Sequence, residues 1–448
     1  MLDTFMKRMQ TYMTTEDFEA FKATFDAPVT RYVRVNPLRI SVYKFKEIFP
    51  YPLQETSVSQ YHFSVGDEVS GNHPYHLGGL FYMQDASAGC AVEAMHIQEG
   101  DRVLDLCAAP GGKSTQISGY LNQKGFLVSN EYVKNRAQIL LSNTERIGAR
   151  NTLVVNEHPQ KLCTYYEGVF NKVLVDAPCS GEGMFHKDHE AIDHWSLEHV
   201  DSCAKRQKEI LDSAYIALAQ GGELVYSTCT FSLQENEYVI RDFLAEHPDM
   251  ELIDPQIAIT RPGINVEGID HTLVRRIYPM DTGEGHFIAR MRKVGECDAR
   301  VYKCIKGSPV TKEITAFLVE QLSEEFYQEN KKRFFMVENS LYYWSIQMPA
   351  FDDLHIVRCG VLCGSVEKNH FRPHHHFYMA FADQLTKKIN LDIHDERVVQ
   401  YLKGNEITCE EVDFNGYGAV CVHGHVLGFI KKSKAQCKNH YPKGLRLV

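Results

Sequence analysis

The sequence predicts an α/β fold with a doubly wound, mainly parallel sheet, a small N-terminal domain and C-terminal α+β modules. Between about residues 78 and 292, short apolar runs alternate with segments of helical period, which is typical of a parallel sheet covered on both faces. Hydrophobic residues make up 44% of the 448 residues and charged residues 24%, so the chain can bury sizeable cores and disorder is excluded. At roughly 150 residues per domain, this length favours about three domains.

The first predicted domain covers residues 1–77. Apolar side chains from Leu2 to Met13 recur at spacings of three and four, which predicts an amphipathic helix. A strand is expected at 32–35, and Asn36-Pro37 ends it. From Ala27 to Lys46 the chain has five basic residues and no acidic one. Such a run forms either an ordinary solvated face or a surface that grips RNA.

The second predicted domain, residues 78–294, contains the alternating pattern. Its expected strands are RVLDLCA, GFLVSNE, NTLVV, KVLVDAP, GELVYSTCT and GHFIARM, and its helices include KSTQISGYL, KNRAQILLSNTERIG and AKRQKEILDSAYIALAQ. Ligands of such sheets bind beyond the carboxyl ends of the strands. The functional site is therefore expected in the turns that follow these strands.

Residues 295–375 and 376–448 are expected to form two small α+β or β-rich modules. The first begins with a helix in VTKEITAFLVEQLSEEFY and continues with a hairpin that turns at Asn339-Ser340. The second contains short strands broken by glycine. Its last part, Lys431 to Arg446, carries six basic residues and no acidic one.

Charge and cysteine content bear on partners and compartment. The chain has 48 Lys and Arg against 58 Asp and Glu, and its net charge of −10 argues on its face against a nucleic-acid partner. The two basic tracts near the ends of the chain reverse that expectation locally. The 13 cysteines, together with the lack of a signal-like segment and of an apolar run of roughly 18 residues, predict free thiols, a cytoplasmic protein and no membrane partner.

The most specific motif is DLCAAPGGKSTQ, Asp105 to Gln116, which follows a strand and opens a helix. A Walker phosphate loop needs Gly where Cys107 stands, and the dinucleotide fingerprint needs a third Gly, so both fail. What remains is a glycine-rich turn whose N–H groups can bind a phosphate or a carboxylate, with Lys113 as added positive charge. Glu131, after the next strand, either accepts the two hydroxyls of a ribose or is an ordinary surface residue.

Two cysteines follow strand ends on the same edge of the predicted sheet. LVDAPCSGEGM places Cys179 three residues after Asp176, and VYSTCTFS places Cys229 just past another strand. A single buried cysteine is usually an apolar filler, but two at equivalent positions favour a shared chemical role. Asp176 can present its carboxyl to a heterocycle, and Pro178 stiffens the turn.

Together, DLCAAPGGKSTQ, DAPCSGEGMF and YSTCTF resemble the signatures of the S-adenosylmethionine-dependent RNA cytosine-5 methyltransferases of the NOL1/NOP2/Sun family. The resemblance covers nearly the whole chain. RVNPLR and YMQDASA are similar to N-terminal segments of that family, and NHYPKGLR to the C-terminal module of its bacterial 16S ribosomal RNA members, the RsmB/RsmF type. It implies a Rossmann-like class I methyltransferase core and a PUA-like RNA-binding module at residues 376–448.

The resemblance also implies roles for the two thiols. Carbon 5 of cytosine is a poor nucleophile, and addition of a thiolate at carbon 6 moves electron density onto it. By the family pattern Cys229 is this nucleophile, Cys179 assists elimination, and Asp176 hydrogen-bonds the base near N3 and O2, protonating or polarising it. Lys187 matches a basic position of the bacterial members and is expected to touch RNA.

The same resemblance makes S-adenosyl-L-methionine the cofactor. One contact is expected after the next strand, where Glu157 is chosen over the alternative Asn156. The implied cofactor-binding residues are Cys107, Ala108, Ala109, Pro110, Gly111, Gly112, Lys113, Glu131, Arg136, Glu157 and Asp176.

A zinc site is the weaker interpretation of a further group of residues. Cys359 and Cys363 are four apart, and His355, His370 and His374–His376 lie nearby. No second close cysteine pair exists, so structural or RNA-facing histidines are favoured and no metal is expected.

We therefore expect a monomeric enzyme that methylates cytosine in ribosomal RNA, with 16S ribosomal RNA or the small subunit as partner. Two alternatives remain open: a DNA or transfer RNA cytosine-5 methyltransferase, and a non-catalytic RNA-binding assembly factor on the same fold. A DNA enzyme would take its nucleophile from a Pro-Cys pair, here Cys179. The second alternative is disfavoured, because binding alone requires no thiols at strand ends.

Overall fold

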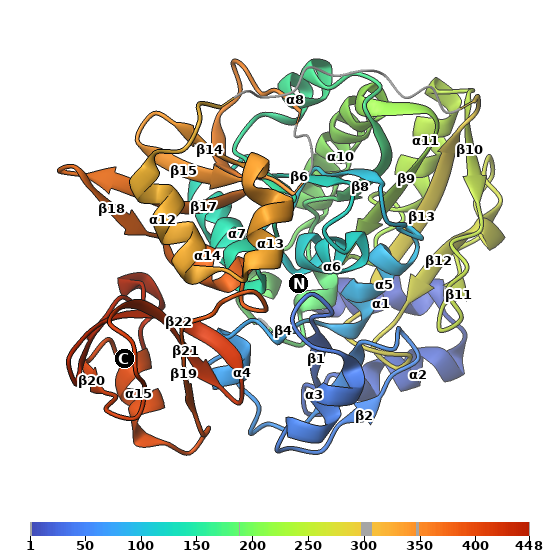
Figure 1. The fold of residues 1–448 in the computed structure, drawn as a ribbon. Helices are drawn as coiled ribbons and strands as arrows, with labels where there is room; N and C mark the ends of the chain where they lie inside the picture. The colour runs from blue at the N-terminus through green and yellow to red at the C-terminus, as the bar shows by residue number, and fades with distance from the viewer. Residues whose placement is uncertain (1, 188, 297–306, 346–348, 448) are drawn as a thin grey trace.

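The computed structural model describes residues 2–187, 189–296, 307–345 and 349–447, and its centre is a ten-stranded sheet (Figure 1). Its order is β11 (Arg261–Pro262), β12 (Val274–Ile277), β13 (His286–Lys293), β9 (Leu218–Thr228), β8 (Phe170–Asp176), β5 (Arg102–Asp105), β6 (Phe126–Asn130), β7 (Thr152–Val155) and β16 (Ile356–Cys359), with β10 (Met250–Ile253) also paired to β13. The five strands from β9 to β7 are parallel. The predicted doubly wound, mainly parallel sheet is confirmed.

Helices cover both faces of this sheet. On one face lie α5 (Ala86–Glu93), α6 (Gly112–Leu121) and α7 (Lys134–Ile147), and on the other α8 (Pro159–Tyr165), α10 (Leu197–Ala217) and α11 (Glu237–Glu246). Neighbouring strand residues alternate between the two cores, so that Val103 lies in the core that contains Ile117 of α6, while Leu104 lies in the core that contains Phe243 of α11. Because both faces are covered, the strands read as continuous apolar runs.

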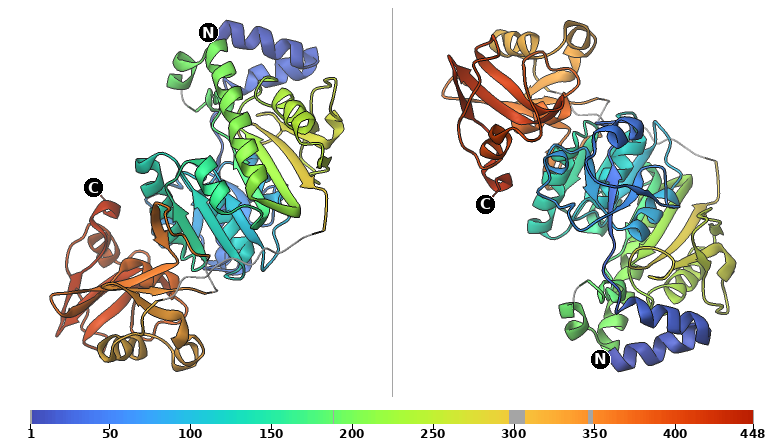
Figure 2. Two further views of the ribbon diagram at one scale, coloured as in Figure 1. Left: turned by 90° about the horizontal axis from the view of Figure 1, so that it is seen from above. Right: turned by 90° about the horizontal axis from the view of Figure 1, so that it is seen from below.

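The N-terminal part contains two helices and a small antiparallel sheet. The helices are α1 (Leu2–Tyr12) and α2 (Thr15–Thr24), the sheet order is β2 (Gln54–Glu55), β3 (His62–Val65), β1 (Arg31–Val35) and β4 (Phe81–Met83), and α3 (Val42–Ile48) and α4 (Pro74–Leu77) accompany it. The apolar face of α1 confirms the predicted amphipathic helix, and Phe5 packs against Phe185 and Trp195 of the central part. Figure 2 shows α1 and α2 (blue) at the opposite end of the molecule from the C-terminal modules (orange and red).

The C-terminal part forms two further sheets. The first has the order β14 (Phe334–Val337), β15 (Ser340–Tyr343), β17 (Val361–Glu367) and β18 (His370–Pro373), with α12 (Lys312–Gln321), α13 (Glu324–Asn330) and α14 (His375–Ala380). The second has the order β19 (Lys388–Leu391), β21 (Gly416–Val422), β22 (His425–Ser433), β23 (Gln436–Asn439) and β20 (Ile407–Thr408), with α15 (Glu396–Leu402). The remaining elements are α9 (His189–His194) and the 3₁₀ segments η1 (Glu182–Met184), η2 (His271–Leu273), η3 (Lys331–Arg333) and η4 (Lys443–Leu445).

Two local predictions in this part are confirmed with adjustments. The hairpin forms, but its turn is Glu338-Asn339, where Glu338 adopts a φ of +51°. The single helix expected in VTKEITAFLVEQLSEEFY is instead two helices, because the backbone becomes extended at Leu322. There Leu322 pairs with Leu385 in an isolated bridge, so tertiary pairing overrides the helical period.

The parts of the chain share structure across the predicted domain boundaries. Strand β16, from the 295–375 range, pairs antiparallel with β7 and so extends the central sheet. The N-terminal sheet and the last module share one hydrophobic core, in which Tyr75 and Leu80 pack with Tyr401 and Leu427. The division into 1–77, 78–294, 295–375 and 376–448 stays a prediction. Within the described ranges, no helix combines the length and the apolar character needed to cross a membrane.

Candidate active site

Two thiols meet at the carboxyl edge of the central sheet. Strands β8 and β9 are parallel neighbours that pair at Asp176 and Ser227, so the turns after them emerge side by side. The Sγ atoms of Cys179 and Cys229 lie 3.3 Å apart, and both residues are half-buried. The hydrogen bond to Cys229 and burial together raise the pKa of the Cys179 thiol well above its usual value. Either thiol can be the donor of this hydrogen bond.

Main-chain contacts hold the two turns against each other. The N–H of Ala177 donates to Ser227 O at 2.9 Å, and the N–H of Gly183 donates to Cys229 O at 2.8 Å. A Cβ at Gly183 would lie 2.9 Å from Glu284 O and 3.0 Å from Cys229 O, which is too close for any other residue. This close approach therefore requires a glycine at position 183, the second glycine of CSGEG.

A salt bridge lies beside the thiols. Asp176 Oδ2 is 2.8 Å from Lys113 Nζ, its Oδ1 accepts a hydrogen bond from Ser227 Oγ at 2.7 Å, and His286 Nε2 is 3.5 Å away. Burial opposes ionisation of Asp176, but Lys113 and His286 outweigh it and hold the pKa of this carboxyl well below its usual range. Lys113 is therefore not a free positive charge at the glycine-rich turn, since its ammonium is held at Asp176.

The glycine-rich turn joins β5 to α6. Gly111 caps the helix with a φ of +113°, a conformation that residues with a Cβ avoid. Asp105, the last residue of β5, is fully buried; its Oδ2 accepts a hydrogen bond from Ser114 Oγ at 2.6 Å. Its Oδ1 has no hydrogen-bond partner among the described residues. The turn therefore encloses a carboxyl oxygen that lacks a hydrogen-bond donor within the described chain. Burial also raises the pKa of Asp105 to about 7.

The residues that follow β6 lie beside the glycine-rich turn. Glu131 is buried; its Oε1 accepts the Val133 N–H at 2.8 Å, and its Oε2 lies 3.5 Å from Arg136 Nη1. Arg136 Nη2 also donates to Ala109 O at 2.9 Å. Arg136 thus connects Glu131 to the glycine-rich turn, and the structure brings these sequence-predicted residues together, with Cys107, Ala108, Pro110 and Gly112 in the same turn.

The two residues considered after β7 have other partners. The Glu157 carboxylate is 2.8 Å from Lys161 Nζ, accepts the His158 N–H at 3.0 Å and lies 3.2 Å from His355 Nδ1. The Asn156 side-chain amide donates to Glu131 O at 2.6 Å. Of the two, Asn156 is the one that contacts the neighbourhood of Glu131, and Glu157 faces α8 and the C-terminal part.

Sequence reasoning missed several residues of this region. Asp105 and Ser227 could have been found, because each ends or nearly ends a strand at the site edge. His286 and Glu235 carry no such signal. His286 begins an antiparallel strand, and Glu235 lies in the loop between β9 and α11.

The predicted RNA contact Lys187 is paired within the chain. Its Nζ lies 2.9 Å from Asp85 Oδ2 and 3.4 Å from Glu284 Oε1. Glu284 in turn contacts His186 Nδ1 at 3.1 Å. The Lys187 ammonium therefore forms ion pairs with two carboxylates of the protein itself.

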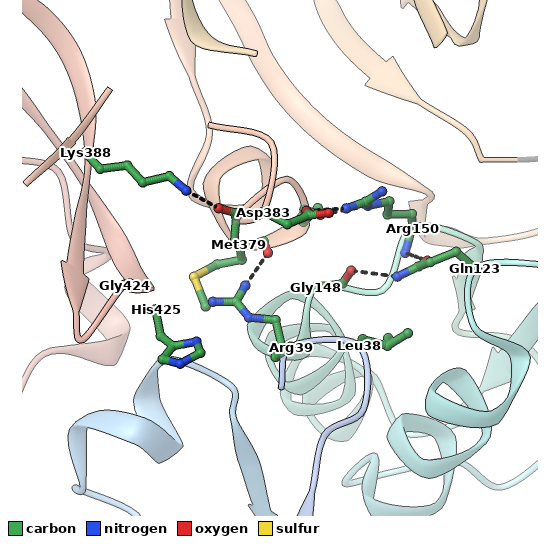
Figure 3. Close-up of a pocket in the computed structure, with 12 residues that line it drawn as sticks. Leu38, Arg39, Gln123, Gly148, Arg150, Met379, Asp383, Lys388, Gly424 and His425 are labelled. Carbon is green, nitrogen blue, oxygen red and sulfur yellow. Dashed lines mark hydrogen bonds and ion pairs between the residues drawn. The ribbon is translucent and has the colours of Figure 1, made fainter. Parts of the chain in front are cut away.

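The residues of the N-terminal basic tract divide between the interior and the surface. Arg34 is buried and donates to Gly112 O and Thr115 Oγ1, both at 2.7 Å. Arg39 donates to Met379 O and to Val426 O, beside a cavity of about 220 Å³ where the parts of the chain meet (Figure 3). The other three basic residues form ion pairs, Arg31 with Asp67, Lys44 with Glu47 and Lys46 with Glu55. Arg34 and Arg39 thus join parts of the chain, whereas Arg31, Lys44 and Lys46 lie exposed at the surface, and RNA binding by this tract stays a prediction.

The C-terminal basic tract, Lys431 to Arg446, has lysines that are exposed and not held in ion pairs among the described residues. Lys431, Lys434, Lys438 and Lys443 are exposed, and none of them has an ion pair within the described residues. Lys431 on β22 stands directly opposite Lys438 on β23. Like charges in this arrangement repel, and an anion between them relieves the repulsion.

The histidines near Cys359 and Cys363 divide between surface and interior, and His355 and His370 are exposed. His375 and His376 are buried, and His376 Nε2 lies 3.2 Å from Ala149 O. Burial lowers the pKa of His375 to about 3. In the part of the chain that the structure describes, no three His, Cys, Asp or Glu side chains are grouped as metal ligands.

Comparison with known proteins finds relatives along the whole chain. A family model described as 16S rRNA methyltransferase RsmB/F matches residues 92–292. Three further models match: the N-terminal domain of 16S rRNA methyltransferase RsmF (2–86), its first C-terminal domain (317–381) and its PUA domain (388–447). Proteins named ribosomal RNA small subunit methyltransferase F from Vibrio campbellii and Aeromonas hydrophila are 30% and 31% identical, each over 99% of this chain and 97% of the relative.

Solved structures agree on the central fold. A methyltransferase homolog protein from Pyrococcus horikoshii is 27% identical, with a TM-score of 0.56 over 62% of this chain and 91% of that one. NSun6 from Pyrococcus horikoshii, solved with SFG, is 22% identical, with a TM-score of 0.55 over 65% of this chain and 98% of that one. The second similarity supports the fold alone.

Proposed function

The chain belongs to the RsmB/F family of 16S ribosomal RNA methyltransferases, and from this premise we propose that it methylates carbon 5 of a cytosine in 16S ribosomal RNA. The cofactor is S-adenosylmethionine, which supplies an electrophilic methyl group when bound. The observation that carries the proposal is the pair of thiols 3.3 Å apart beside the Asp176–Lys113 salt bridge. Methylation of a carbon that must first be activated needs such a nucleophile.

The residues around β5 and β6 fit this cofactor. The unpartnered Oδ1 of Asp105 is an acceptor suited to the ammonium of its amino-acid end. The buried Glu131 carboxylate suits a ribose, whose hydroxyls are donors. The N–H groups of the glycine-rich turn suit the cofactor carboxylate. We therefore propose that Cys107 to Gly112, Glu131 and Arg136 hold S-adenosylmethionine.

Cys229 is the proposed nucleophile. Its thiol gives its proton to water, the sulfur forms a bond to carbon 6 of cytosine, and the electron pair of the 5,6 double bond moves onto carbon 5. Carbon 5 would then use this electron pair to bond the methyl group that the cofactor supplies, as the bond between that methyl group and the cofactor sulfur breaks. Cys179 supports this assignment, because a thiol whose pKa is raised remains protonated and can donate a hydrogen bond to a neighbouring thiolate.

Asp176 and Lys113 are proposed to hold the base. Because the pKa of Asp176 is held low, this carboxylate can accept a hydrogen bond from the base and polarise it, but it has no proton of its own to give. The Lys113 ammonium, 2.8 Å away, is the available donor for the charge that develops at N3 and O2. Of the two expected roles of Asp176, protonating or polarising the ring, the low pKa of its carboxyl favours polarising.

Elimination completes the proposed reaction. The proton on carbon 5 leaves to water, its electron pair restores the 5,6 double bond, and the bond between carbon 6 and Cys229 breaks. Cys179 lies 3.3 Å from the departing sulfur and can supply the proton that makes Cys229 a neutral leaving thiol. The last module, with its exposed lysines, is proposed to bind the RNA backbone.

The test is methyl transfer from labelled S-adenosylmethionine to 16S ribosomal RNA, supplied both as naked RNA and as small subunits from cells without this protein. Nucleoside analysis should show 5-methylcytosine, which is lost with C229A. Label in another nucleoside, or activity that survives in C229A, would contradict the proposal. Double-stranded DNA as substrate tests the alternative. A DNA enzyme using the Pro-Cys pair would lose covalent trapping in C179A and keep it in C229A.

A further inference from the structure

A single carboxylate behind the two cysteines is bonded to both of their turns. Glu235 is fully buried. Its Oε2 accepts the N–H of Ser180 at 2.9 Å and its Oε1 accepts Ser180 Oγ at 2.5 Å, directly after Cys179. The same Oε1 accepts Thr230 Oγ1 at 3.2 Å, directly after Cys229. One side chain therefore joins the turns that carry the two thiols.

The surroundings of Glu235 hold it in this place. Gln207 of α10 donates from Nε2 to Glu235 Oε2 at 2.9 Å and to Pro178 O at 3.1 Å. The hydroxyl of Tyr226 donates to Glu235 O at 2.6 Å. Within the described residues its hydrogen-bond partners are all neutral, and it takes part in no ion pair. A carboxylate kept in a buried site by neutral donors alone is costly, so its geometry points to a positioning role.

In the described part of the chain, Asn236, the residue after Glu235, forms side-chain hydrogen bonds only with the turn that carries Cys229. Asn236 Oδ1 accepts from Thr228 Oγ1 at 2.6 Å, and its Nδ2 donates to Thr230 O at 2.9 Å. Asn236 thus shapes the turn around Cys229 from both sides. Direct contacts also join the two turns: Ser180 Oγ lies 2.9 Å from Thr230 Oγ1, the N–H groups of Ala177 and Gly183 donate to Ser227 O and Cys229 O, and the Phe231 N–H donates to Glu182 Oε2 at 3.0 Å.

We infer that Glu235 is a positioning residue that sets the separation of the Cys179 and Cys229 sulfurs by tying Ser180 to Thr230. The consequence for catalysis rests on the proposed function. If Cys179 gives its proton to the departing Cys229 sulfur, widening the gap between them slows release of the methylated base. It leaves formation of the Cys229 adduct largely intact, because that step needs only Cys229 and the base.

The first experiment measures the separation without using the methyltransferase reaction. Diamide takes two electrons and two protons from two thiols that are close together, leaving a disulfide. In the wild-type protein it should form the Cys179–Cys229 disulfide, identified by peptide mass mapping. E235Q has the same shape but places an NH2 group against the donors of Ser180 and Gln207. We expect about a tenfold slower disulfide, because a shift of about 1 Å between reacting groups costs up to about a hundredfold.

The control is E246Q, at the exposed end of α11, which should oxidise at the wild-type rate. Thermal unfolding checks that E235Q is folded. If it is not, S180A removes the same tie from the other side and should slow the disulfide as well. A disulfide rate in E235Q or S180A equal to that of E246Q overturns the inference.

The second experiment reads the catalytic consequence. RNA carrying 5-fluorocytidine traps the adduct, because carbon 5 then has no proton to lose, whereas normal RNA reports complete turnover. E235Q should lower turnover about tenfold while trapping at nearly the wild-type rate, with KM unchanged. A merely structural defect would lower both in proportion, and that result overturns the positioning role. If the wild-type protein traps no RNA but E235Q still slows the disulfide, the proposed function fails and the positioning of the thiols stands.

Discussion

The Sγ atoms of Cys179 and Cys229 lie 3.3 Å apart although 50 residues separate them in the chain. The contact arises because β8 and β9 are parallel neighbours whose carboxyl ends lie at one edge of the sheet. Burial and the hydrogen bond to Cys229 raise the pKa of the Cys179 thiol well above its usual value, which keeps this thiol protonated. The two cysteines should therefore behave differently when each is removed.

Replacing each cysteine separates attack from release. C229A should lose both methyl transfer and covalent trapping, because no sulfur remains to add to carbon 6. C179A should still attach to RNA but release it slowly, so that a covalent complex accumulates with normal substrate. Denaturing gel electrophoresis of protein–RNA complexes measures this. C421A, on β21 of the last module, is the control and should turn over normally; a C179A protein with wild-type turnover would contradict the division of roles.

Removing Lys113 should destabilise the protein in a pH-dependent way. K113M leaves Asp176 without its main counter-ion. We expect a loss of about 2–3 kcal/mol in the free energy of unfolding at pH 7, less than the roughly 3–5 of an enclosed pair, because the Asp176 side chain is 29% exposed. The pKa of Asp176 is lowered by folding, so its stabilisation is present above its unfolded pKa and is lost as pH falls through the folded one.

Urea denaturation of K113M at pH 7 and at about pH 3, below the unfolded pKa of Asp176, checks this prediction. The difference from wild type should shrink at the lower pH. The double variant K113M/D176N removes both charges and should recover part of the loss. Equal stabilities of K113M and wild type at pH 7 would show that the pair contributes nothing.

Cofactor affinity should increase as pH rises toward 7. Folding raises the pKa of Asp105 to about 7, so this residue contributes stability to the free protein at low pH that is lost as pH rises through 7. An ammonium at Oδ1 favours the ionised form. Below pH 7, binding of S-adenosylmethionine should weaken by at most about tenfold per pH unit, since one proton is released, and above it the affinity should level off.

Isothermal titration calorimetry between pH 5.5 and 8.5 measures this profile. D105N cannot ionise, so it should bind more weakly at pH 8 and show no such step. A D105N protein with the wild-type affinity and profile would place the cofactor ammonium elsewhere.

The two basic tracts should respond oppositely to substitution. R39Q removes charge-assisted hydrogen bonds to Met379 O and Val426 O, and should cost roughly 1.5–3 kcal/mol of stability per bond without changing the salt dependence of RNA binding. K438Q should raise stability slightly, since it removes the repulsion between the exposed side chains of Lys438 and Lys431. It should reduce the slope of log K against log salt by about 0.7–0.9.

Filter binding of 16S ribosomal RNA across a salt series, beside thermal unfolding of the same variants, distinguishes these outcomes. A changed salt slope in R39Q, or none in K438Q, would move the RNA contact to a different surface.

Local patterns determined much of this protein. The strands ending at Asp105, Asp176 and Thr228 could be predicted because apolar runs and helical periods are properties of neighbouring residues. The same holds for the glycine-rich turn and for the placement of both cysteines after strand ends. Parallel strands align their carboxyl ends, so the location of the candidate site followed from the order of strands and helices alone.

Only the tertiary structure decided which polar groups meet. Composition made Arg34 and Arg39 candidates for RNA, but folding buries Arg34, half-buries Arg39 and pairs both with carbonyl or hydroxyl groups far along the chain. Glu235 meets Ser180 across 55 residues, and Lys113 meets Asp176 across 63. A charge run or a lone glutamate looks the same in sequence whether its partner is solvent or protein. The partner depends on long-range packing, which has no period along the chain.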